Sequence, residues 1–176
     1  MDKRLISNLS KDLVYQICID ISCGIEYLHS KKILYLDIKV NNILLSEGRR
    51  AKICDFGCSF QNAVELVLWD GGTPAYISPE FIRTSRRGRL ADIWDCGLVM
   101  GFVLRVWPLP RGRWTIANIR NGKGDAATKM LEWFNEIEGS KQRIPKKYSL
   151  LLEMLEINLS HRITSSELVK NLRKPS

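Results

Sequence analysis

Two clusters of polar residues, joined by two short apolar runs, constrain the fold of this chain more than any other feature. Asp37, Lys39 and Asn42 form the first cluster, and Asp55 begins the second. The residues between them, 43 to 54, have the pattern of two short strands around a Glu-Gly turn. Because an antiparallel pair places the outer ends of its strands side by side, this hairpin would bring Asn42 and Asp55 to neighbouring positions.

The residue types at these positions suit phosphoryl transfer, which needs an oriented nucleophile, a bridging metal ion and charge neutralisation. The carboxylate of Asp37 can accept a hydroxyl proton, and Lys39 brings positive charge to the phosphoryl group. The amide oxygen of Asn42 and the carboxylate of Asp55 are hard oxygen ligands suited to Mg²⁺. Two unrelated acidic turns are the alternative, but the order and spacing of the residues favour one phosphoryl-transfer site.

Composition narrows the remaining classes of protein. The 176 residues are 45% hydrophobic and 26% charged, which fits one globular domain with one core. The five cysteines form no C-x-x-C pair and there are only two histidines, so we expect no zinc site. The chain lacks an apolar signal region and any apolar stretch long enough to span a bilayer. We therefore expect an intracellular, reducing location, most simply the cytoplasm, with the nucleus also open.

The net charge of +8 raises the question of acidic partners. Basic residues gather in two stretches, at Arg83, Arg86, Arg87 and Arg89 and at Arg105, Arg111 and Arg113. They would suit an acidic partner or substrate, although solvated loops are the plainer explanation. Nucleic acid is not expected, because no aromatic stacking platform or nucleic-acid motif accompanies them.

Helical periodicity accounts for most of the rest of the chain. Residues 10–30 show one apolar face, with Ser10 as a plausible N-cap. Residues 90–105 are apolar nearly all round, which predicts a helix buried at the centre of the domain, where Gly97 and Gly101 would let other backbone approach. Further helices are expected from Asp125 to Gly139, over 147–157, and after a capping box at 164–167. The predicted fold is mainly α with a small β-hairpin.

These pieces, in this order, resemble the C-terminal lobe of a eukaryotic-type protein kinase of the serine/threonine kind, over essentially the whole chain, 1–176. The family motifs fall at 35–42 (catalytic loop), 55–57 (D-F-G), 55–80 (activation segment, ending Ser-Pro-Glu), 92–97 (D-x-W-x-x-G, in the central helix 90–105) and 162–164 (R-x-T). The L-D-x-K in the catalytic loop and the Cys-Ser after D-F-G are further similar to fungal and Mos-like kinases.

The resemblance implies roles for individual residues, with ATP and Mg²⁺ as cofactors and a protein as substrate. The matching positions are Asp37 (catalytic base), Lys39 and Thr73 (serine/threonine subclass), Asn42 and Asp55 (metal ligands), Phe56 and Gly57 (the rest of D-F-G) and Leu44 (floor under the adenine ring). For Leu44 a plain core leucine is an equally good interpretation, and for Thr73 a simple turn residue is as well supported.

The family also implies two structural contacts. Arg162 should form a largely buried ion pair with Glu80, at the end of the activation segment. Asp92 should accept hydrogen bonds from backbone N–H groups of the catalytic loop and hold that loop in place.

The pattern departs from the family at the two residues before Asp37. Tyr35 stands where the family has His, and an aromatic ring there can still pack against Phe56. Leu36 stands where the family has Arg, which in many kinases binds a phosphorylated residue of the activation segment. Leucine offers such a phosphate nothing to bind, so we expect that phosphorylation of this segment does not switch the protein. A phosphomimetic substitution that raised activity several-fold would contradict this.

The sequence contains no G-x-G-x-x-G, and we expect the small β-rich lobe that carries this loop in the family to be absent. Without it, ATP affinity should fall by roughly a thousandfold, and the isolated chain should have little or no activity. Two functions stay open: a kinase catalytic fragment that an N-lobe completes, or a non-catalytic binding module or decoy that docks a partner through the exposed face where the small lobe would sit. A degenerate product that hardly folds is a third possibility.

Overall fold

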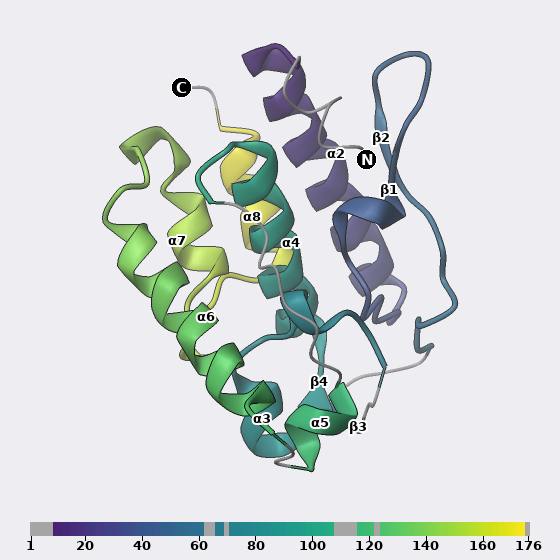
Figure 1. Ribbon diagram of the computed structural model, residues 1–176. Coiled ribbons are helices and arrows are strands. Elements are labelled where there is room, and N and C mark those ends of the chain that lie inside the picture. Colours follow the sequence, from purple (N-terminus) through teal and green to yellow (C-terminus); the bar gives the residue numbers. More distant parts are fainter. Residues whose placement is uncertain (1–8, 62–65, 69–70, 108–115, 122–123, 175–176) are drawn as a thin grey trace.

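A computed structural model describes residues 9–61, 66–68, 71–107, 116–121 and 124–174. Helix α4 (Arg89–Val103) runs through the middle of the molecule (Figure 1). Twelve of its 15 residues are buried, as the nearly all-apolar sequence predicts. It packs against α2 (Lys11–Ser30) on one side and α7 (Leu150–Met154) on another. The central buried helix is therefore confirmed, with bounds one to two residues from those expected.

The two glycines of α4 mark its closest contacts. A Cβ added at Gly97 would lie 3.0 Å from Leu155 Cδ2, and one added at Gly101 would lie 1.9 Å from Trp107 Cζ2. The expectation that backbone would approach at these glycines was wrong, because the nearest atoms belong to side chains. Because glycine has no side chain, the Leu155 side chain can pack against α4 at Gly97 and the Trp107 ring can pack against it at Gly101.

Helix α2 begins at the predicted cap, where the Ser10 hydroxyl accepts a hydrogen bond of 3.3 Å from the Leu13 N–H. Its apolar face packs against α4 and against α8 (Ser165–Leu172). The buried apolar residues of this face are Val14, Ile17, Cys18, Ile21, Ile25 and Leu28. Their spacing of three or four residues places them on one side of the helix.

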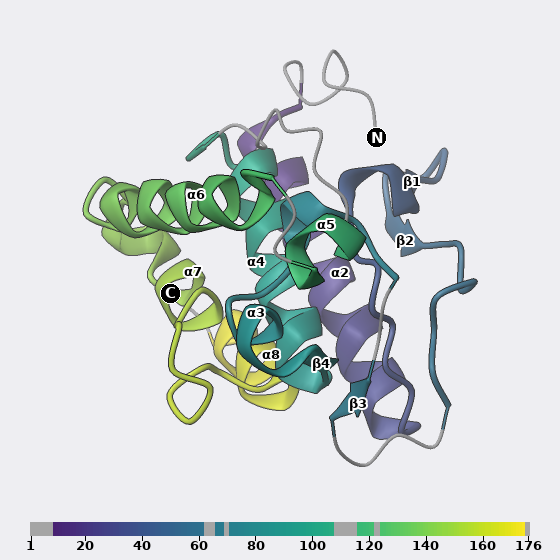
Figure 2. The same ribbon diagram turned by 60° about the horizontal axis from the view of Figure 1, so that its bottom comes forward.

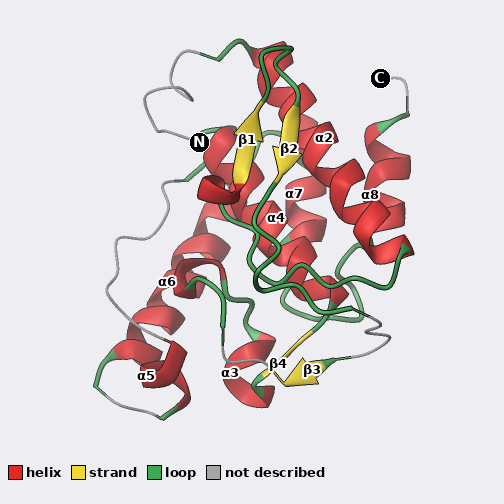
Figure 3. Cartoon of the chain, turned by 90° about the vertical axis from the view of Figure 1, so that its right-hand side faces the viewer, coloured by secondary structure: helices red, strands yellow, loops and turns green. Residues whose placement is uncertain are grey.

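The predicted hairpin is present beside α2 (Figure 3). Strand β1 (Ile43–Leu45) pairs antiparallel with β2 (Ala51–Ile53), and Ile43 lies opposite Ile53. A short 3₁₀ turn, η1 (Val40–Asn42), leads into β1. The ends of the hairpin therefore bring the catalytic-loop segment and the D-F-G segment together.

One carboxylate ties this hairpin to α2. Asp20 accepts hydrogen bonds from the Arg50 guanidinium at 2.7–3.0 Å and from the Ala51 N–H at 2.8 Å. Partial burial raises the pKa of Asp20, but the bonds from Arg50 and Ala51 outweigh it and hold the pKa below its ordinary value. The charged form of Asp20 therefore fastens β2 to the helix.

A second small ladder, not expected from the sequence, joins β3 (Val67–Leu68) to β4 (Arg86–Arg87). It lies beside α3 (Glu80–Thr84), at the end of the molecule away from the hairpin (Figures 2 and 3). Each strand has only two residues, too few for a period-two pattern to show in the sequence. The 3₁₀ turn η2 (Pro74–Tyr76) lies between the two strands in sequence.

The C-terminal part is helical, with two corrections to the expected bounds. Helix α6 (Ala126–Lys141) follows α5 (Ile116–Arg120) and continues past Gly139, which was predicted to end it. Gly139 has no atom within 4 Å of an added Cβ, and one exposed glycine costs a helix only about 1 kcal/mol. Burial of the neighbouring Ser140 keeps the last turn in place.

The helix expected over 147–157 is shorter, because 3₁₀ turn η3 (Lys146–Tyr148) precedes α7 and loops follow it. The capping box before α8 is present, with Thr164 and Glu167 bonded to each other's backbone N–H groups. All five cysteines are free thiols. Within the described ranges, no helix has both the length and the apolar character needed to cross a membrane. Arg111 and Arg113 lie outside the described residues.

Candidate active site

Asp37 gathers three other predicted site residues around its buried carboxylate. Lys39 Nζ donates to Oδ2 at 2.6 Å, and Asn42 Nδ2 donates to the same oxygen at 3.2 Å. Thr73 Oγ1 donates to Oδ1 at 2.9 Å. Thr73 therefore reaches this carboxylate from the activation segment, which a simple turn residue would have no reason to do.

The hairpin places Asp55 beside this group. The Cys54 N–H donates to the Asn42 carbonyl at 2.9 Å, so Asp55 follows directly after a residue bonded to Asn42. Asp55 is exposed and has a φ of 64°, a left-handed conformation that aspartate tolerates better than most residues. Its Oδ1 accepts a 3.3 Å hydrogen bond from the Gly57 N–H. A carboxylate and an amide oxygen thus lie at one edge of the site.

The oxygen atoms of Asn42 and Asp55 suit an ion such as Mg²⁺, which also takes ligands from water and nucleotide, better than a metal ion that needs all its ligands from the protein. Among the described residues, no group of three or more His, Cys, Asp or Glu side chains could hold a metal ion. Mg²⁺ typically takes only one or two protein ligands and completes its shell with water and phosphate oxygens. The Asn42 amide nitrogen is turned toward Asp37, which leaves its oxygen for such an ion together with Asp55.

Tyr35, which stands where the family has histidine, contacts the D-F-G segment through both its hydroxyl group and its ring. Its hydroxyl donates to the Asp55 carbonyl at 2.9 Å and also contacts the Cys54 carbonyl. Its ring meets Phe56 edge to face, with centroids 5.4 Å apart, as expected. Burial raises the pKa of the Tyr35 hydroxyl, so it stays a neutral donor.

Leu44 is not a core residue. Its side chain is 55% exposed on β1, two residues after Asn42, and the Phe56 side chain is 50% exposed. This exposure excludes the alternative of a plain core leucine, and the role of Leu44 as a floor under adenine stays a prediction.

Helix α4 anchors the catalytic loop through Asp92, as expected. The backbone N–H groups of Tyr35 and Leu36 donate to the Asp92 carboxylate at 2.9 and 2.7 Å. His29, at the end of α2, lies 3.0 Å from the same carboxylate and 2.9 Å from the Ser165 hydroxyl. No role was predicted for His29, although its place on the buried face of α2 was a sign that it needed a polar partner.

A second anchor was missed in the sequence. Arg87 and Asp95 are each only 1% exposed and form an ion pair, and Arg87 Nη1 donates to the Leu36 carbonyl at 2.5 Å. Burial raises the pKa of Asp95, although Arg87 beside it opposes the shift. The explanation of the arginine cluster as solvated loops was therefore wrong for Arg87. The signal was Asp95 itself, a charge inside an otherwise apolar helix.

The ion pair expected between Glu80 and Arg162 is present and buried. Arg162 Nη1 and Nη2 each donate to one oxygen of Glu80 at 3.0 Å. Arg162 also donates to the carbonyls of Leu90 at 2.9 Å and Glu156 at 2.8 Å, and lies 5.1 Å from the Trp94 ring. This cluster fixes the end of the activation segment to the start of α4.

Leu36 lies in an apolar setting. It is fully buried in a small cluster with Leu34, and Val67 of β3 packs against this cluster. A side chain of the activation segment thus joins the apolar cluster at the position where the family has a phosphate-binding arginine. Within the described part of this segment, the contact is apolar. The prediction that phosphorylation does not switch the protein agrees with this arrangement and stays a prediction.

Comparison with known proteins decides the family. The model of the protein kinase domain matches residues 2–172. The chain belongs to the protein kinase family. It is 32% identical over 170 residues to CBL-interacting protein kinase 2 of Oryza sativa, covering 93% of this chain and 36% of that kinase. It is 37% identical over 107 residues to a calcium/calmodulin-dependent protein kinase kinase of Caenorhabditis elegans, covering 57% of this chain and 20% of that protein.

A further relative is mitogen-activated protein kinase kinase kinase 17 of Arabidopsis thaliana. It is 43% identical to this chain over 83 residues, which cover 46% of this chain and 22% of the relative. The chain spans about a third of the length of the first curated relatives it matches. Two relatives from Arabidopsis thaliana that each match about nine tenths of this chain are named as CBL-interacting serine/threonine-protein kinases, which supports that class for this chain.

Proposed function

We propose that this chain provides the catalytic centre of a serine/threonine protein kinase, which moves the γ-phosphoryl group of ATP to a hydroxyl group of a protein. One observation carries the proposal: the buried Asp37 carboxylate receives Lys39, Asn42 and Thr73 at 2.6–3.2 Å, with Asp55 placed beside Asn42 by the hairpin. These are the charges and ligands that phosphoryl transfer needs.

In the proposed reaction Asp37 accepts the proton of the substrate hydroxyl as its oxygen bonds to the γ-phosphorus. The bond from that phosphorus to the bridging oxygen of ADP breaks, and ADP leaves with the electron pair. Lys39 neutralises charge on the transferred group. Asn42 and Asp55 would hold Mg²⁺, which supplies charge neutralisation and alignment for the phosphates. Leu44 would lie under the adenine ring.

We further propose that transfer requires a small lobe that covers the nucleotide. The test compares the chain alone with the chain fused after a kinase small lobe, using γ-labelled ATP and a mixed protein substrate. The fused protein should transfer phosphate, and Asp37→Asn should lower its kcat by roughly 10²–10⁴-fold. Glu47→Gln, in the exposed hairpin turn, is the matched control and should leave the rate unchanged. Transfer that persisted in Asp37→Asn would refute the assignment.

A readout that does not depend on turnover tests the metal ligands. Binding of a fluorescent ATP analogue to the fused protein should depend on Mg²⁺, and Asp55→Asn should remove that dependence. Leu44→Ser should weaken nucleotide binding with or without the metal, because it removes apolar contact rather than a ligand. Metal dependence that survived Asp55→Asn would place the ion elsewhere.

The exposed Leu44 and Phe56 favour one alternative, a binding module that docks another kinase's small lobe through this face. Such a module would inhibit its partner by competition and would need no proton acceptor. Inhibition of a partner kinase that is unchanged in Asp37→Ala but lost in Leu44→Ser would select this function over catalysis.

A further inference from the structure

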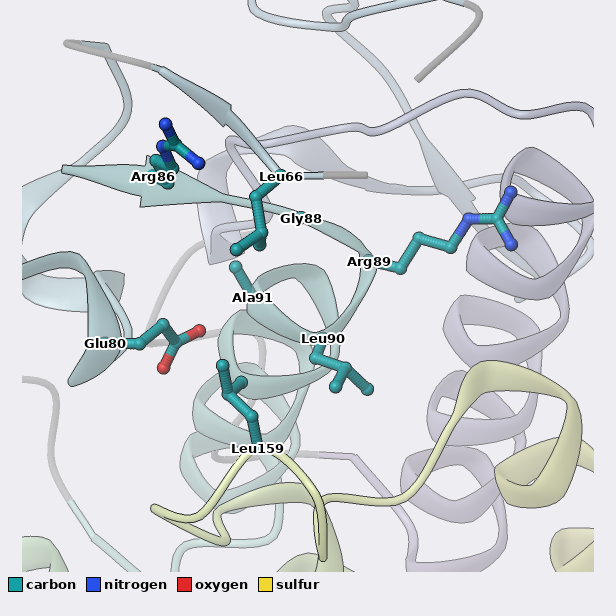
Figure 4. A pocket seen from close by; sticks show the side chains of 8 residues that line it. All are labelled: Leu66, Glu80, Arg86, Gly88, Arg89, Leu90, Ala91 and Leu159. Carbon is teal, nitrogen blue, oxygen red and sulfur yellow. The ribbon is translucent and has the colours of Figure 1, made fainter. Parts of the chain in front are cut away.

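A second concave site lies where the activation segment meets the start of α4, and its lining includes none of the residues around Asp37. Figure 4 shows its apolar walls, to which Leu66, Leu90 and Leu159 contribute from three segments far apart in sequence. Its volume of about 400 Å³ falls in the usual range for ligand sites, roughly 300–1,000 Å³. We call it the Leu159 pocket.

The floor of the Leu159 pocket is rigid and electrically neutral. Glu80 points into the hollow (Figure 4), but both of its carboxylate oxygens accept hydrogen bonds of 3.0 Å from the buried Arg162. Arg162 also bonds to the carbonyl of Leu90, a wall residue, at 2.9 Å. Glu80, the one carboxylate among the described lining residues, is therefore compensated, and it does not repel an acidic ligand as a free glutamate would.

The absence of a side chain at Gly88 shapes the wall. Its φ of −154° is extended backbone that any residue adopts, so conformation does not call for glycine here. A Cβ at this position would come within 2.8 Å of Leu66 Cδ2. Glycine therefore lets Leu66 pack against the backbone between β4 and α4 and form one side of the hollow, with the Leu66 side chain still 45% exposed.

The rim of the pocket is positively charged. Arg86 and Arg89 line it on opposite sides, and both are exposed; in Figure 4 the guanidinium group of each extends outward, away from the hollow. Neither arginine is in an ion pair with a described residue, whereas the neighbouring Arg87 is buried against Asp95. Exposed Arg83 on α3 adds to the same surface.

We infer that the Leu159 pocket is a docking site for an acidic peptide segment that inserts one large apolar side chain between flanking Asp or Glu residues. The apolar walls would bury the inserted side chain, and the arginines on opposite sides would meet carboxylates before and after it. An extended peptide lying across the pocket can make the apolar contact and the two charge contacts together. Its successive residues advance by about 3.3–3.6 Å along the backbone, and the long, flexible arginine stems can adjust to the positions of its carboxylates.

An acidic peptide fits this chemistry better than nucleic acid does. Both are polyanions, but sites for single-stranded nucleic acid stack bases on aromatic rings. Among the described residues that line the Leu159 pocket, the walls are leucine and alanine, and none is aromatic. A pocket of this kind selects an aliphatic or aromatic side chain by its size and apolar character.

The test uses a labelled heptapeptide that has phenylalanine at its centre and glutamate at all of the remaining positions. Its fluorescence anisotropy is measured as the full chain is titrated in. Phosphoryl transfer is not needed, so a failure here and a failure of the proposed kinase activity are distinguishable. Replacing the phenylalanine by serine should weaken binding by about tenfold to a hundredfold. Arg86→Glu with Arg89→Glu should weaken it by at least about tenfold.

The matched control, Arg49→Glu with Lys52→Glu, makes the same change in net charge on the hairpin at the far end of the molecule (Figure 3) and should leave affinity within about twofold. Leu159→Ser should weaken the phenylalanine peptide and leave the serine peptide unchanged. Equal affinity for the phenylalanine and serine peptides, equal loss in the hairpin control, or tighter binding of an oligonucleotide of the same charge would each overturn the inference. So would the absence of peptide binding by a chain that melts cooperatively.

Discussion

The buried Arg87–Asp95 pair should behave asymmetrically when either partner is removed. In Asp95→Leu the arginine stays buried with no counter-ion and cannot lose its proton. Removing one partner of a buried pair costs about 3–5 kcal/mol, a large part of the roughly 5–15 kcal/mol that stabilises a typical domain. Both side chains are 1% exposed, so neither can turn into solvent to escape that cost.

The double variant Arg87→Met with Asp95→Leu should recover most of the loss, because it buries no charge. What it does not restore is the hydrogen bond from Arg87 to the Leu36 carbonyl. An unsatisfied buried carbonyl costs about 1–3 kcal/mol. The double variant should therefore be about 1–3 kcal/mol less stable than the parent and more stable than Asp95→Leu.

Arg87→Met alone adds a dependence on pH. Burial raises the pKa of Asp95, and the loss of Arg87 removes the influence that opposes the rise. The folded variant then keeps a proton at Asp95 at pH values where the unfolded chain, with an ordinary pKa of about 3.9, has lost it. Stability should fall as the pH rises above about 4, by up to roughly 1.4 kcal/mol per pH unit.

Urea unfolding followed by far-ultraviolet circular dichroism, at several pH values between about 4 and 10, measures all three variants. Burial, opposed by Arg87, raises the pKa of Asp95 in the parent to about 8, so the parent should stop losing stability through this group above that pH, whereas Arg87→Met should go on losing it. The reasoning fails if the losses of the two single variants simply add in the double variant. It also fails if Arg87→Met becomes more stable as the pH rises over this range.

Three further changes test other parts of the fold by thermal or urea unfolding. Gly101→Ala should cost about 1–3 kcal/mol or more, since its Cβ would lie 1.9 Å from the Trp107 ring and force it to move. Thr164→Ala should cost about 1 kcal/mol by removing the cap of α8, and Thr164→Ser should restore it. Asp20→Asn should lower the melting temperature at neutral pH, because the lowered pKa of Asp20, held down by Arg50 against the effect of burial, marks a carboxylate that the fold stabilises. The difference from the parent should shrink as the pH falls below about 4, because the unfolded parent takes up a proton on Asp20 there and the folded parent, with its lowered pKa, does so only at lower pH; a gap that widened there would contradict this.

Local patterns in the sequence predicted the elements whose cause is local. The hairpin follows from two short apolar runs around a turn, and both helix caps follow from hydroxyl residues before apolar periods. The buried helix over 89–103 was predictable because a helix that is apolar on nearly all sides is stable only in the interior of the domain. The family motifs then supplied the Glu80–Arg162 contact, which no local pattern contains.

The features that the sequence did not predict depend on contacts between distant segments. The β3–β4 ladder forms from two-residue strands that pair across the activation segment. Asp95 required a buried partner, but nothing in the sequence singled out Arg87 among the nearby arginines. Helix α7 ends at Met154, and the chain after it runs as a loop to Arg162, which bonds to the distant Glu80. The helical periodicity of residues 147–157 has no information about this contact.

The backbone of Leu36, the residue before Asp37, explains how the catalytic loop can be held without a phosphate. Its N–H donates to Asp92 and its carbonyl accepts from Arg87, which Asp95 in turn holds. Asp92 and Asp95 are three residues apart and so share one face of α4. Leu36 has a φ of 67°, a costly conformation for leucine that persists only where its surroundings determine it fully. Two anchors from one buried helix supply that determination, and the leucine side chain adds an apolar contact to the activation segment. The position of Asp37 thus depends on buried groups of one helix and not on an added phosphate, and we expect phosphorylation of the activation segment to leave this loop unchanged.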